Sequence, residues 1–214
     1  SSPEVLLDFL TQPVFVEKNS LLSDFLCARS ADLCEEIKRS GPSARWKRVL
    51  EICDRHMSYP HTGGVVIFVG STNIAKLLTS ELSDLHGPHH VRCHLATMSL
   101  VEQDESIDFF LRHDGCRVLV MDRSGEEGRN LQGASEIVHF SIPISPNQLE
   151  QRLGRADRFS ESMHHRATST VFLESDSALI AGLFEFLAKG LNIFNRSVAT
   201  AQHLLSIEFQ NLLL

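Results

Sequence analysis

Five short segments between residues 65 and 173 decide the fold class of this chain. They are mostly apolar and rich in Val, Ile, Leu and Phe, and they cover residues 65–69, 91–95, 117–121, 137–140 and 170–173. The stretches between them carry apolar side chains at helical spacing, as at Ile74, Leu78 and Leu82. Continuous apolar strands that alternate with helices are typical of a parallel sheet covered on both faces. We therefore predict an α/β domain, a doubly wound parallel sheet flanked by helices.

Both ends of the chain have a helical pattern instead. Apolar residues recur at helical spacing between residues 20 and 38, and again from residue 179 onward. Ser43 is placed to cap a further helix that holds Trp46, Val49, Leu50 and Cys53. The predicted divisions are a helical segment over 1–60, the α/β domain over 61–175 and a C-terminal helical extension over 176–214. The C-terminal helices either brace the α/β domain or dock on protein partners, and the pattern leaves both open.

Composition narrows the class of protein. The chain has 214 residues, 43% of them hydrophobic, which is enough for one domain with a sizeable core. A formal net charge of -7 argues against a stand-alone nucleic-acid binder, but not against a domain that contacts phosphates through a local patch. No apolar run approaches the roughly 20 residues of a membrane span, and the first residues do not form a signal peptide. We expect a cytoplasmic protein with no membrane contact, and a chain cut from a larger one.

The cysteines and histidines do not predict a metal site. The five cysteines are odd in number and lack C-x-x-C spacing, and the eleven histidines have no cysteine or carboxylate completing a ligand set at helix spacing. We expect reduced, mostly buried thiols and surface histidines.

The segments that follow the predicted strands are where a doubly wound sheet binds ligands. Gly70, Ser71 and Thr72 follow the first strand and begin a helix, whose free N–H groups could hold a phosphate. An ordinary helix cap is the alternative. Residues 122–132 follow the third strand, and the two glycines within them could let the backbone pass close to a ligand. A plain polar connection is the alternative.

The helix predicted over residues 147–158 has a polar face. Gln151, Arg155 and Arg158 stand at i, i+4 and i+7, and Gly154 removes a side chain beside them, so that another surface can approach. A guanidinium group offers a planar fork of donors and stays charged, so it can stabilise charge on a transferring phosphoryl group. The alternative is a solvated face with neighbouring carboxylates as ion-pair partners.

Together and in this order, these segments resemble the second lobe of superfamily-two helicases. Residues 151–158 look like the Q-x-x-G-R-x-x-R arginine-finger motif, and residues 124–132 resemble the preceding motif with its G-x-N-L-Q-like ending. Residues 65–71 and 94–99 are similar to the motif that opens the lobe and to a Thr-Met-Ser-like turn. Within the superfamily the Swi/Snf branch looks closest, especially its bacterial RNA-polymerase-recycling ATPases. The resemblance covers roughly residues 60–175.

The resemblance implies a RecA-like lobe that pairs with a first RecA-like lobe and meets ATP in the cleft between them. Arg155 and Arg158 match the family's catalytic arginine fingers. The positions that match its nucleotide-binding loop and sensor are Gln151, Gly125, Glu127 and Gly128. The positions that match its contacts to the sugar-phosphate backbone are Gly70, Ser71, Thr72, Thr97 and Ser124. Backbone contacts carry little sequence information, and the branch favours double-stranded DNA as the nucleic acid.

The chain lacks a G-x-x-x-x-G-K-[ST] loop and a paired acidic Mg²⁺ motif. In the family these belong to the first lobe, which would hold ATP with Mg²⁺, and residues 1–60 would then link from that lobe. We expect the intact protein to be an ATP-dependent helicase or translocase, an ATP hydrolase, and this chain alone to be inactive. Glu102 and Phe159-Ser160 depart from the family pattern. The alternative is a catalytically silent RecA-like protein-interaction module.

Overall fold

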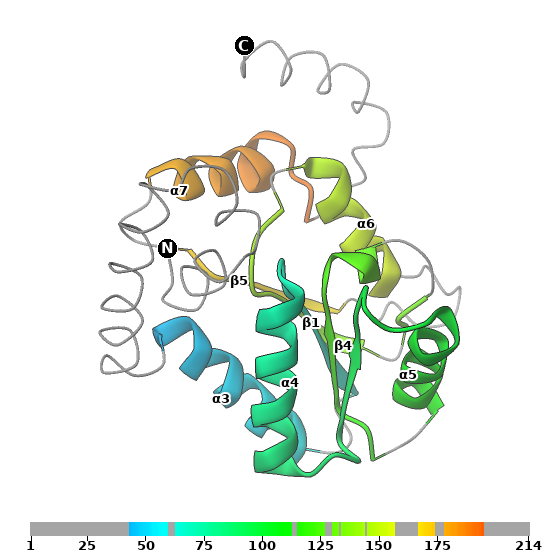
Figure 1. The fold of residues 1–214 in the computed structure, drawn as a ribbon. Coiled ribbons are helices and arrows are strands. Elements are labelled where there is room, and N and C mark those ends of the chain that lie inside the picture. The colour runs from blue at the N-terminus through cyan, green and yellow to red at the C-terminus, as the bar shows by residue number, and fades with distance from the viewer. Residues whose placement is uncertain are drawn as a thin grey trace, which may run out of the picture.

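The computed structural model describes residues 43–59, 63–112, 115–126, 130–132, 134–143, 145–156, 167–173 and 178–194. These residues form a five-stranded sheet in the order β2-β3-β1-β4-β5, with every neighbouring pair parallel (Figure 1). The strands are β1 (Gly64–Phe68), β2 (Val91–His94), β3 (Val118–Met121), β4 (Ala134–His139) and β5 (Thr168–Val171). The predicted fold class, a RecA-like α/β domain with a parallel sheet, is confirmed.

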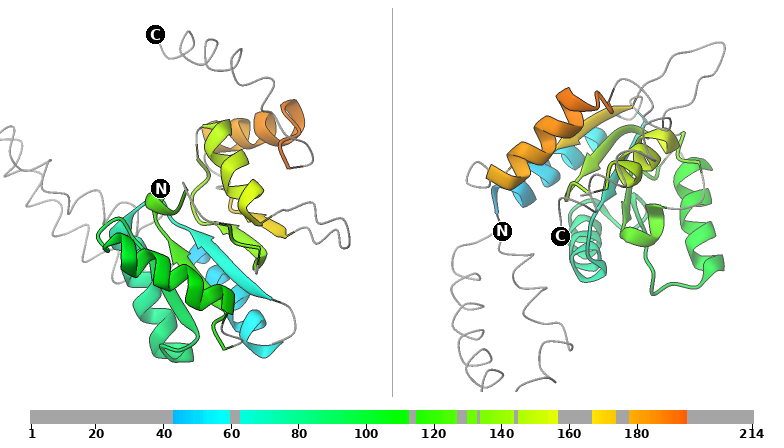
Figure 2. Two further views of the ribbon diagram at one scale, coloured as in Figure 1. Left: turned by 90° about the vertical axis from the view of Figure 1, so that its right-hand side faces the viewer. Right: turned by 90° about the horizontal axis from the view of Figure 1, so that it is seen from above.

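Helices connect the strands and cover the sheet. They are α3 (Ala44–Ser58), α4 (Thr72–His86), α5 (Leu100–Arg112), α6 (Pro146–Ala156) and α7 (Ala178–Glu185), with a 3-10 turn η2 (Arg123–Glu126) and a π-helical turn η3 (Phe186–Gly190). The helices α4, α5 and α6 follow β1, β2 and β4, as the alternating pattern predicts. Figure 2 shows the sheet between its covering helices from two further directions.

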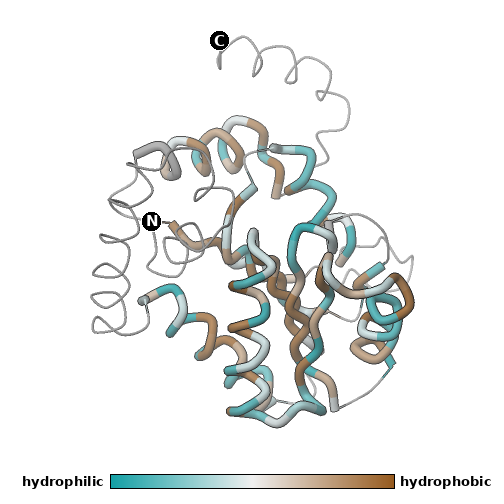
Figure 3. The backbone as a smooth tube through the Cα atoms, in the orientation of Figure 1, coloured by the Kyte–Doolittle hydropathy of each residue, from teal (hydrophilic) through white to brown (hydrophobic). Residues whose placement is uncertain are grey.

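The two faces of the central strand β1 point into different halves of the core. Val65 and Ile67 pack with α3 and α4, whereas Val66 and Phe68 pack with α5 and α6. All five residues of β1 are buried, because a parallel strand covered on both sides has no solvent face. The apolar colouring of the central strands in Figure 3 follows from this position.

The helix α3 belongs to this core. Ser43 accepts a hydrogen bond from the Trp46 amide at 3.2 Å, as the sequence predicts for a helix cap. Trp46, Val49 and Cys53 are buried against α4 and the sheet. The boundary predicted at residue 60 therefore falls between a strand and a helix that share one core.

The strand β4 begins earlier than its apolar run. The prediction starts this strand at residue 137, but pairing with β1 begins at Ala134 and includes Glu136. Glu136 is 5% exposed and accepts hydrogen bonds from Arg55 at 2.6 Å, His56 at 3.1 Å and Thr170 at 2.7 Å. A buried carboxylate is tolerated because these donors satisfy it, and they come from segments that a local pattern cannot see.

The described part of the C-terminal extension packs on α6. Leu149 of α6, Leu187 of η3 and Ile193 form a small buried cluster, and Leu183 of α7 packs against it. The left view of Figure 2 shows the orange helix beside α6. Residues 178–194 therefore pack against the α/β domain, which is the bracing alternative for this part of the C-terminal extension. None of the helices in the described ranges is long and apolar enough to cross a membrane. The helix expected between residues 20 and 38 and the tail over 195–214 lie outside the described residues.

Candidate nucleotide and nucleic-acid site

The segments that follow the strands meet at one edge of the sheet. Residues 70–72 follow β1, residues 95–99 follow β2, residues 122–126 follow β3 and Ser141 follows β4. The strands are parallel, so their carboxyl ends lie together. This edge, called the carboxyl edge below, is the upper end of the sheet in Figure 1.

Asp122 is the hydrogen-bond centre of the carboxyl edge. Its Oδ2 accepts from the Thr72 hydroxyl at 2.6 Å and from the Ala96 amide at 2.9 Å. Its Oδ1 accepts from the Ser124 hydroxyl at 2.6 Å and from the Ser124 amide at 2.9 Å. One carboxylate therefore joins the segments that follow β1, β2 and β3. Burial opposes ionisation of Asp122, which is 2% exposed, but these hydrogen bonds outweigh burial and lower its pKa.

His94, at the end of β2, extends this network. Its Nδ1 lies 3.3 Å from the Ser124 hydroxyl oxygen. The Ser124 hydroxyl donates its hydrogen to Asp122, so it accepts from the Nδ1–H of His94. Burial lowers the pKa of His94, which favours the neutral ring. The Asp122 amide also donates to the His94 carbonyl at 3.2 Å, so β2 and β3 are tied where they end.

The β1 and β4 ends lie close together, and the Phe140 amide donates to the Phe68 carbonyl at 3.0 Å. A Cβ atom on Gly70 would lie 2.8 Å from the Ser141 hydroxyl oxygen, so a larger residue there would require the Ser141 side chain to shift. The next residue, Ser71, caps α4 and accepts from the Ile74 amide at 3.4 Å. Gly70 thus has a packing role, and the start of α4 is held at the carboxyl edge.

Arg155 of α6 reaches the segment that follows β3. It donates from Nη1 to the carbonyl oxygen of Gly125 at 2.7 Å, and its own carbonyl accepts from the Leu131 amide at 2.9 Å. Gly125 packs tightly, since a Cβ there would lie 2.6 Å from Cε and 2.9 Å from Cβ of Met121. The arrangement places a half-buried guanidinium group beside the loop that the resemblance assigns to the nucleotide.

Arg152 anchors α6 to the sheet one turn before Arg155. It is 2% exposed, donates to the Ser141 carbonyl at 3.0 Å and lies over the Phe68 ring, 5.0 Å from its centre. Phe68 in turn stacks on His139 of β4, at 6.4 Å between ring centres. His139 is fully buried, and burial and the charge of Arg152 lower its pKa to about 3.

The structure brings most of the predicted site residues to the carboxyl edge. Those it describes there are Gly70, Ser71, Thr72, Thr97, Ser124, Gly125 and Arg155. Gln151 is exposed on α6, one turn before Arg155, and Thr97 is exposed in the turn after β2. Arg158, Glu127 and Gly128 lie outside the described residues.

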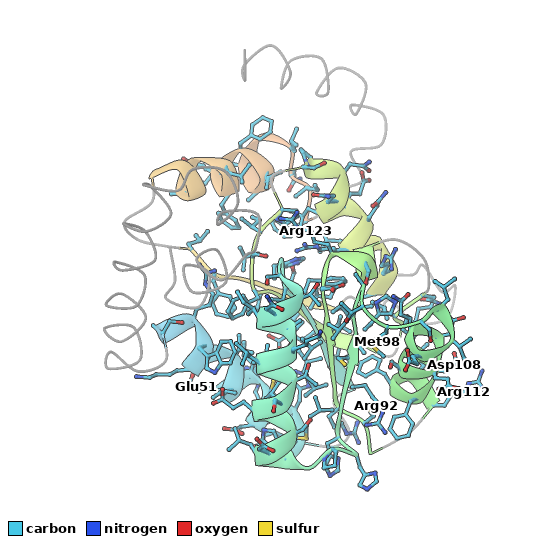
Figure 4. All side chains as sticks on the ribbon, viewed as in Figure 1. Glu51, Arg92, Met98, Asp108, Arg112 and Arg123 are labelled. Carbon is cyan, nitrogen blue, oxygen red and sulfur yellow. The ribbon has the colours of Figure 1, made fainter. Side chains whose placement is uncertain are left out.

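Three residues of the network were not predicted as part of the site. Asp122 and Arg152 were not singled out, and His94 was predicted to be a surface histidine, which is wrong, because it ends β2 and is 6% exposed. Asp122 offered a signal, because a charged residue directly after a buried strand stands at the end where ligands bind. Arg123 follows it in η2, is exposed, and is labelled at this end of the sheet in Figure 4.

The hydrogen bonds of Glu102 give a structural reason for its departure from the family pattern. Its carboxylate accepts from the Ser99 amide at 2.7 Å and from the Ser99 hydroxyl at 2.8 Å, while Ser99 Oγ accepts from the Glu102 amide at 3.3 Å. This reciprocal pair is a capping box at the start of α5.

The residues present fit the phosphate end of a nucleotide only in part. Arg155 supplies a half-buried cation beside Gly125. Within the described ranges, no group of three or more His, Cys, Asp or Glu side chains could hold a metal ion. The cysteines described, Cys53, Cys93 and Cys116, are free thiols.

Comparison with known proteins agrees with this geometry. The family described as the helicase conserved C-terminal domain matches residues 47–160. RNA polymerase-associated protein RapA of Serratia proteamaculans is 32% identical over 117 residues, which cover 54% of this chain and 12% of that protein. RapA of Vibrio cholerae is 34% identical over 106 residues, covering 49% and 11%. The chain thus matches only about an eighth of the length of these relatives.

Solved structures share the fold. The match to the C-terminal part of the Fun30 ATPase domain covers 94% of this chain and 67% of the Fun30 chain, with a TM-score of 0.52 and 17% identity. The Pyrococcus furiosus Hef helicase domain covers 86% of this chain and 39% of its own, with a TM-score of 0.56 and 18% identity. The C-terminal domain of the DEAD-box protein Dbp5 covers 69% and 78%, with a TM-score of 0.55 and 19% identity.

Proposed function

Because this chain belongs to the family of helicase conserved C-terminal domains, we propose that it is the second motor lobe of an ATP-dependent translocase that tracks double-stranded DNA. The observation that carries the proposal is the 2.7 Å hydrogen bond from Arg155 to the Gly125 carbonyl. It joins the helix with the finger motif to the segment that follows β3. In this proposal the segment after β3 holds both Gly125, which contacts the nucleotide, and Ser124, which lies toward the nucleic acid, so the bond links the finger helix to the segment that couples the two sites.

On the nucleotide side, Arg155 and Arg158 act as arginine fingers. A guanidinium group in a closed cleft stabilises the charge that spreads over a transferring phosphoryl group. Arg155 is half-buried and anchored through its backbone to Leu131, so its position relative to the sheet is fixed while its head group can change partner. Gln151, Gly125, Glu127 and Gly128 complete the nucleotide contacts in this proposal.

On the nucleic-acid side, the carboxyl edge contacts the sugar-phosphate backbone. The first turn of α4 offers amide groups and the positive end of a helix dipole, both of which suit phosphate. Thr97 lies exposed beside it. Such contacts position the duplex without reading its sequence, as a motor that moves along DNA requires.

ATP with Mg²⁺ is held mainly by a first RecA-like lobe. When bound, it supplies the phosphoryl group whose transfer to water drives the motor. This chain contributes cations and a closing surface, so by itself it does not hydrolyse ATP at the rate of the intact motor.

The test is steady-state ATP hydrolysis by the two-lobe protein, with and without double-stranded DNA, for the wild type and Arg155→Ala. We expect DNA-stimulated turnover that falls on the order of a thousandfold in the variant. Arg112→Ala is the matched control, because Arg112 is exposed at the end of α5 (Figure 4) and pairs only with Asp108 among the ion pairs of the described residues. Full turnover in Arg155→Ala, or no turnover in the wild type, would favour a silent protein-interaction module instead.

A further inference from the structure

The carboxyl edge contains a buried carboxylate that the finger motif and the predicted backbone contacts do not explain. Asp122 directly follows β3, and two of the hydroxyl groups predicted to contact DNA, those of Thr72 and Ser124, both donate to it. A hydroxyl group has a single hydrogen, so neither can donate to a phosphate at the same time. Their role therefore differs from direct phosphate binding.

We propose that Asp122 is a positioning residue that sets the DNA-facing geometry of the carboxyl edge by holding three segments in one register. This inference rests on the proposed function. Asp122 receives Thr72 from the start of α4, Ala96 from the turn after β2, and Ser124 from its own turn. These partners are 50, 26 and 2 residues away along the chain.

The geometry favours a charged acceptor at this position. All four donors point at the two oxygens of Asp122, two donors to each oxygen. A carboxylate accepts at both oxygens, whereas an amide of the same shape accepts at one and donates at the other. In Asp122→Asn, the amide nitrogen would face either the Ala96 or the Ser124 amide hydrogen, so one segment must move away.

Thr72 acts through Asp122 in this arrangement. Its hydroxyl fixes the first residue of α4, and so fixes the direction in which the amides of that turn face the DNA. Replacing Thr72 by Val removes the donor while keeping the shape. Thr79 provides a matched control, because it lies on the same helix and its hydroxyl donates within the helix, to the Ala75 carbonyl at 2.7 Å.

The experiment measures DNA-stimulated ATP hydrolysis by the two-lobe protein as a function of duplex concentration. For Asp122→Asn we expect the half-saturating DNA concentration to rise about tenfold, as for the loss of one charge-assisted hydrogen bond. The rate at saturating DNA should fall much less. A purely structural role would instead lower the melting temperature and the saturating rate with no change in half-saturation, and that result would overturn the proposal.

A double-mutant cycle separates positioning from direct contact. If Thr72 acts through Asp122, Thr72→Val adds nothing to Asp122→Asn, whereas Thr79→Val leaves DNA affinity as in the wild type. Additive losses would mean that Thr72 binds phosphate itself, which contradicts the proposal.

Amide hydrogen exchange in this chain, measured without DNA, tests whether Asp122 is the hydrogen-bond centre of the carboxyl edge. In Asp122→Asn the amide of Ala96 or that of Ser124, whichever faces the new amide nitrogen, should exchange at least about tenfold faster, because it loses its acceptor. Unchanged exchange would refute Asp122 as the centre. A wild-type motor that DNA does not stimulate would instead refute the proposed function, so the two failures are distinguishable.

Discussion

Replacing Gly154 by Ala should stabilise this chain and impair the motor. Gly154 lies within α6, is exposed, and a Cβ atom there meets no heavy atom of the described residues within 4 Å. A glycine in a helix is less stable than alanine by about 0.5–1 kcal/mol, since it loses more backbone freedom on folding. The described packing of the lobe gives no reason for a glycine at this position.

The magnitude follows from helix propensity alone. A gain of about 0.5–1 kcal/mol raises the melting temperature of a chain of this size by about 1–4 °C. Thermal unfolding of the 214-residue chain measures it. Gly125→Ala is the opposite control, because its Cβ would lie 2.9 Å from Met121 Cβ, which cannot move away as a side-chain end can, and such overpacking costs about 1–3 kcal/mol. A lower melting temperature for Gly154→Ala would refute the reasoning.

The Gly154→Ala variant also tests whether another surface approaches α6 in the two-lobe protein. Gly154 lies between Gln151 and Arg155 on the helix. If the first lobe closes over this face, an added methyl group holds the lobes apart, and ATP turnover by the two-lobe protein falls although the lobe itself is more stable. Full turnover in Gly154→Ala would show that no surface comes close to this position.

Two further predictions concern buried ionisable groups. His139, with a folded pKa of about 3 and an unfolded pKa near 6.5, takes up a proton on unfolding, so stability is full above about pH 6.5 and falls by up to about 1.4 kcal/mol per pH unit below it. Urea unfolding at pH 7.5, 6 and 5 should show a flatter dependence for His139→Gln, and equal slopes would contradict this. Glu136→Gln should destabilise the chain by about 1.5–3 kcal/mol, because Arg55, His56 and Thr170 lose a charged acceptor. A loss below about 0.5 kcal/mol by the same method would show that these bonds add little.

The sheet was predictable because its signal is local. A continuous apolar run such as residues 65–69 has one physical solution, burial on both faces, and the Ser43 cap depends on a partner three residues away. The polar face of α6 was likewise visible from residue spacing, and Arg155 on that face donates to the Gly125 carbonyl in η2.

The network beneath the site was not predictable in the same way. Asp122 bonds to Thr72 and Ala96, and Arg152 to Ser141, across gaps of 50, 26 and 11 residues. Only the strand order brings these groups together. Thr72 and Ser124 were predicted as nucleic-acid contacts because hydroxyl groups suit phosphate, yet the nearby carboxylate takes their hydrogens.

The double anchorage of α6 has a mechanical consequence. Arg152 ties the helix to the sheet through Ser141, and Leu149 ties it to η3 through Leu187. Because α6 is held on both sides, we expect it to move together with the sheet as one rigid body. In the proposed motor, the hinge angle between the lobes therefore governs the approach of Arg155 to the nucleotide, and bending of the helix contributes little to the stroke.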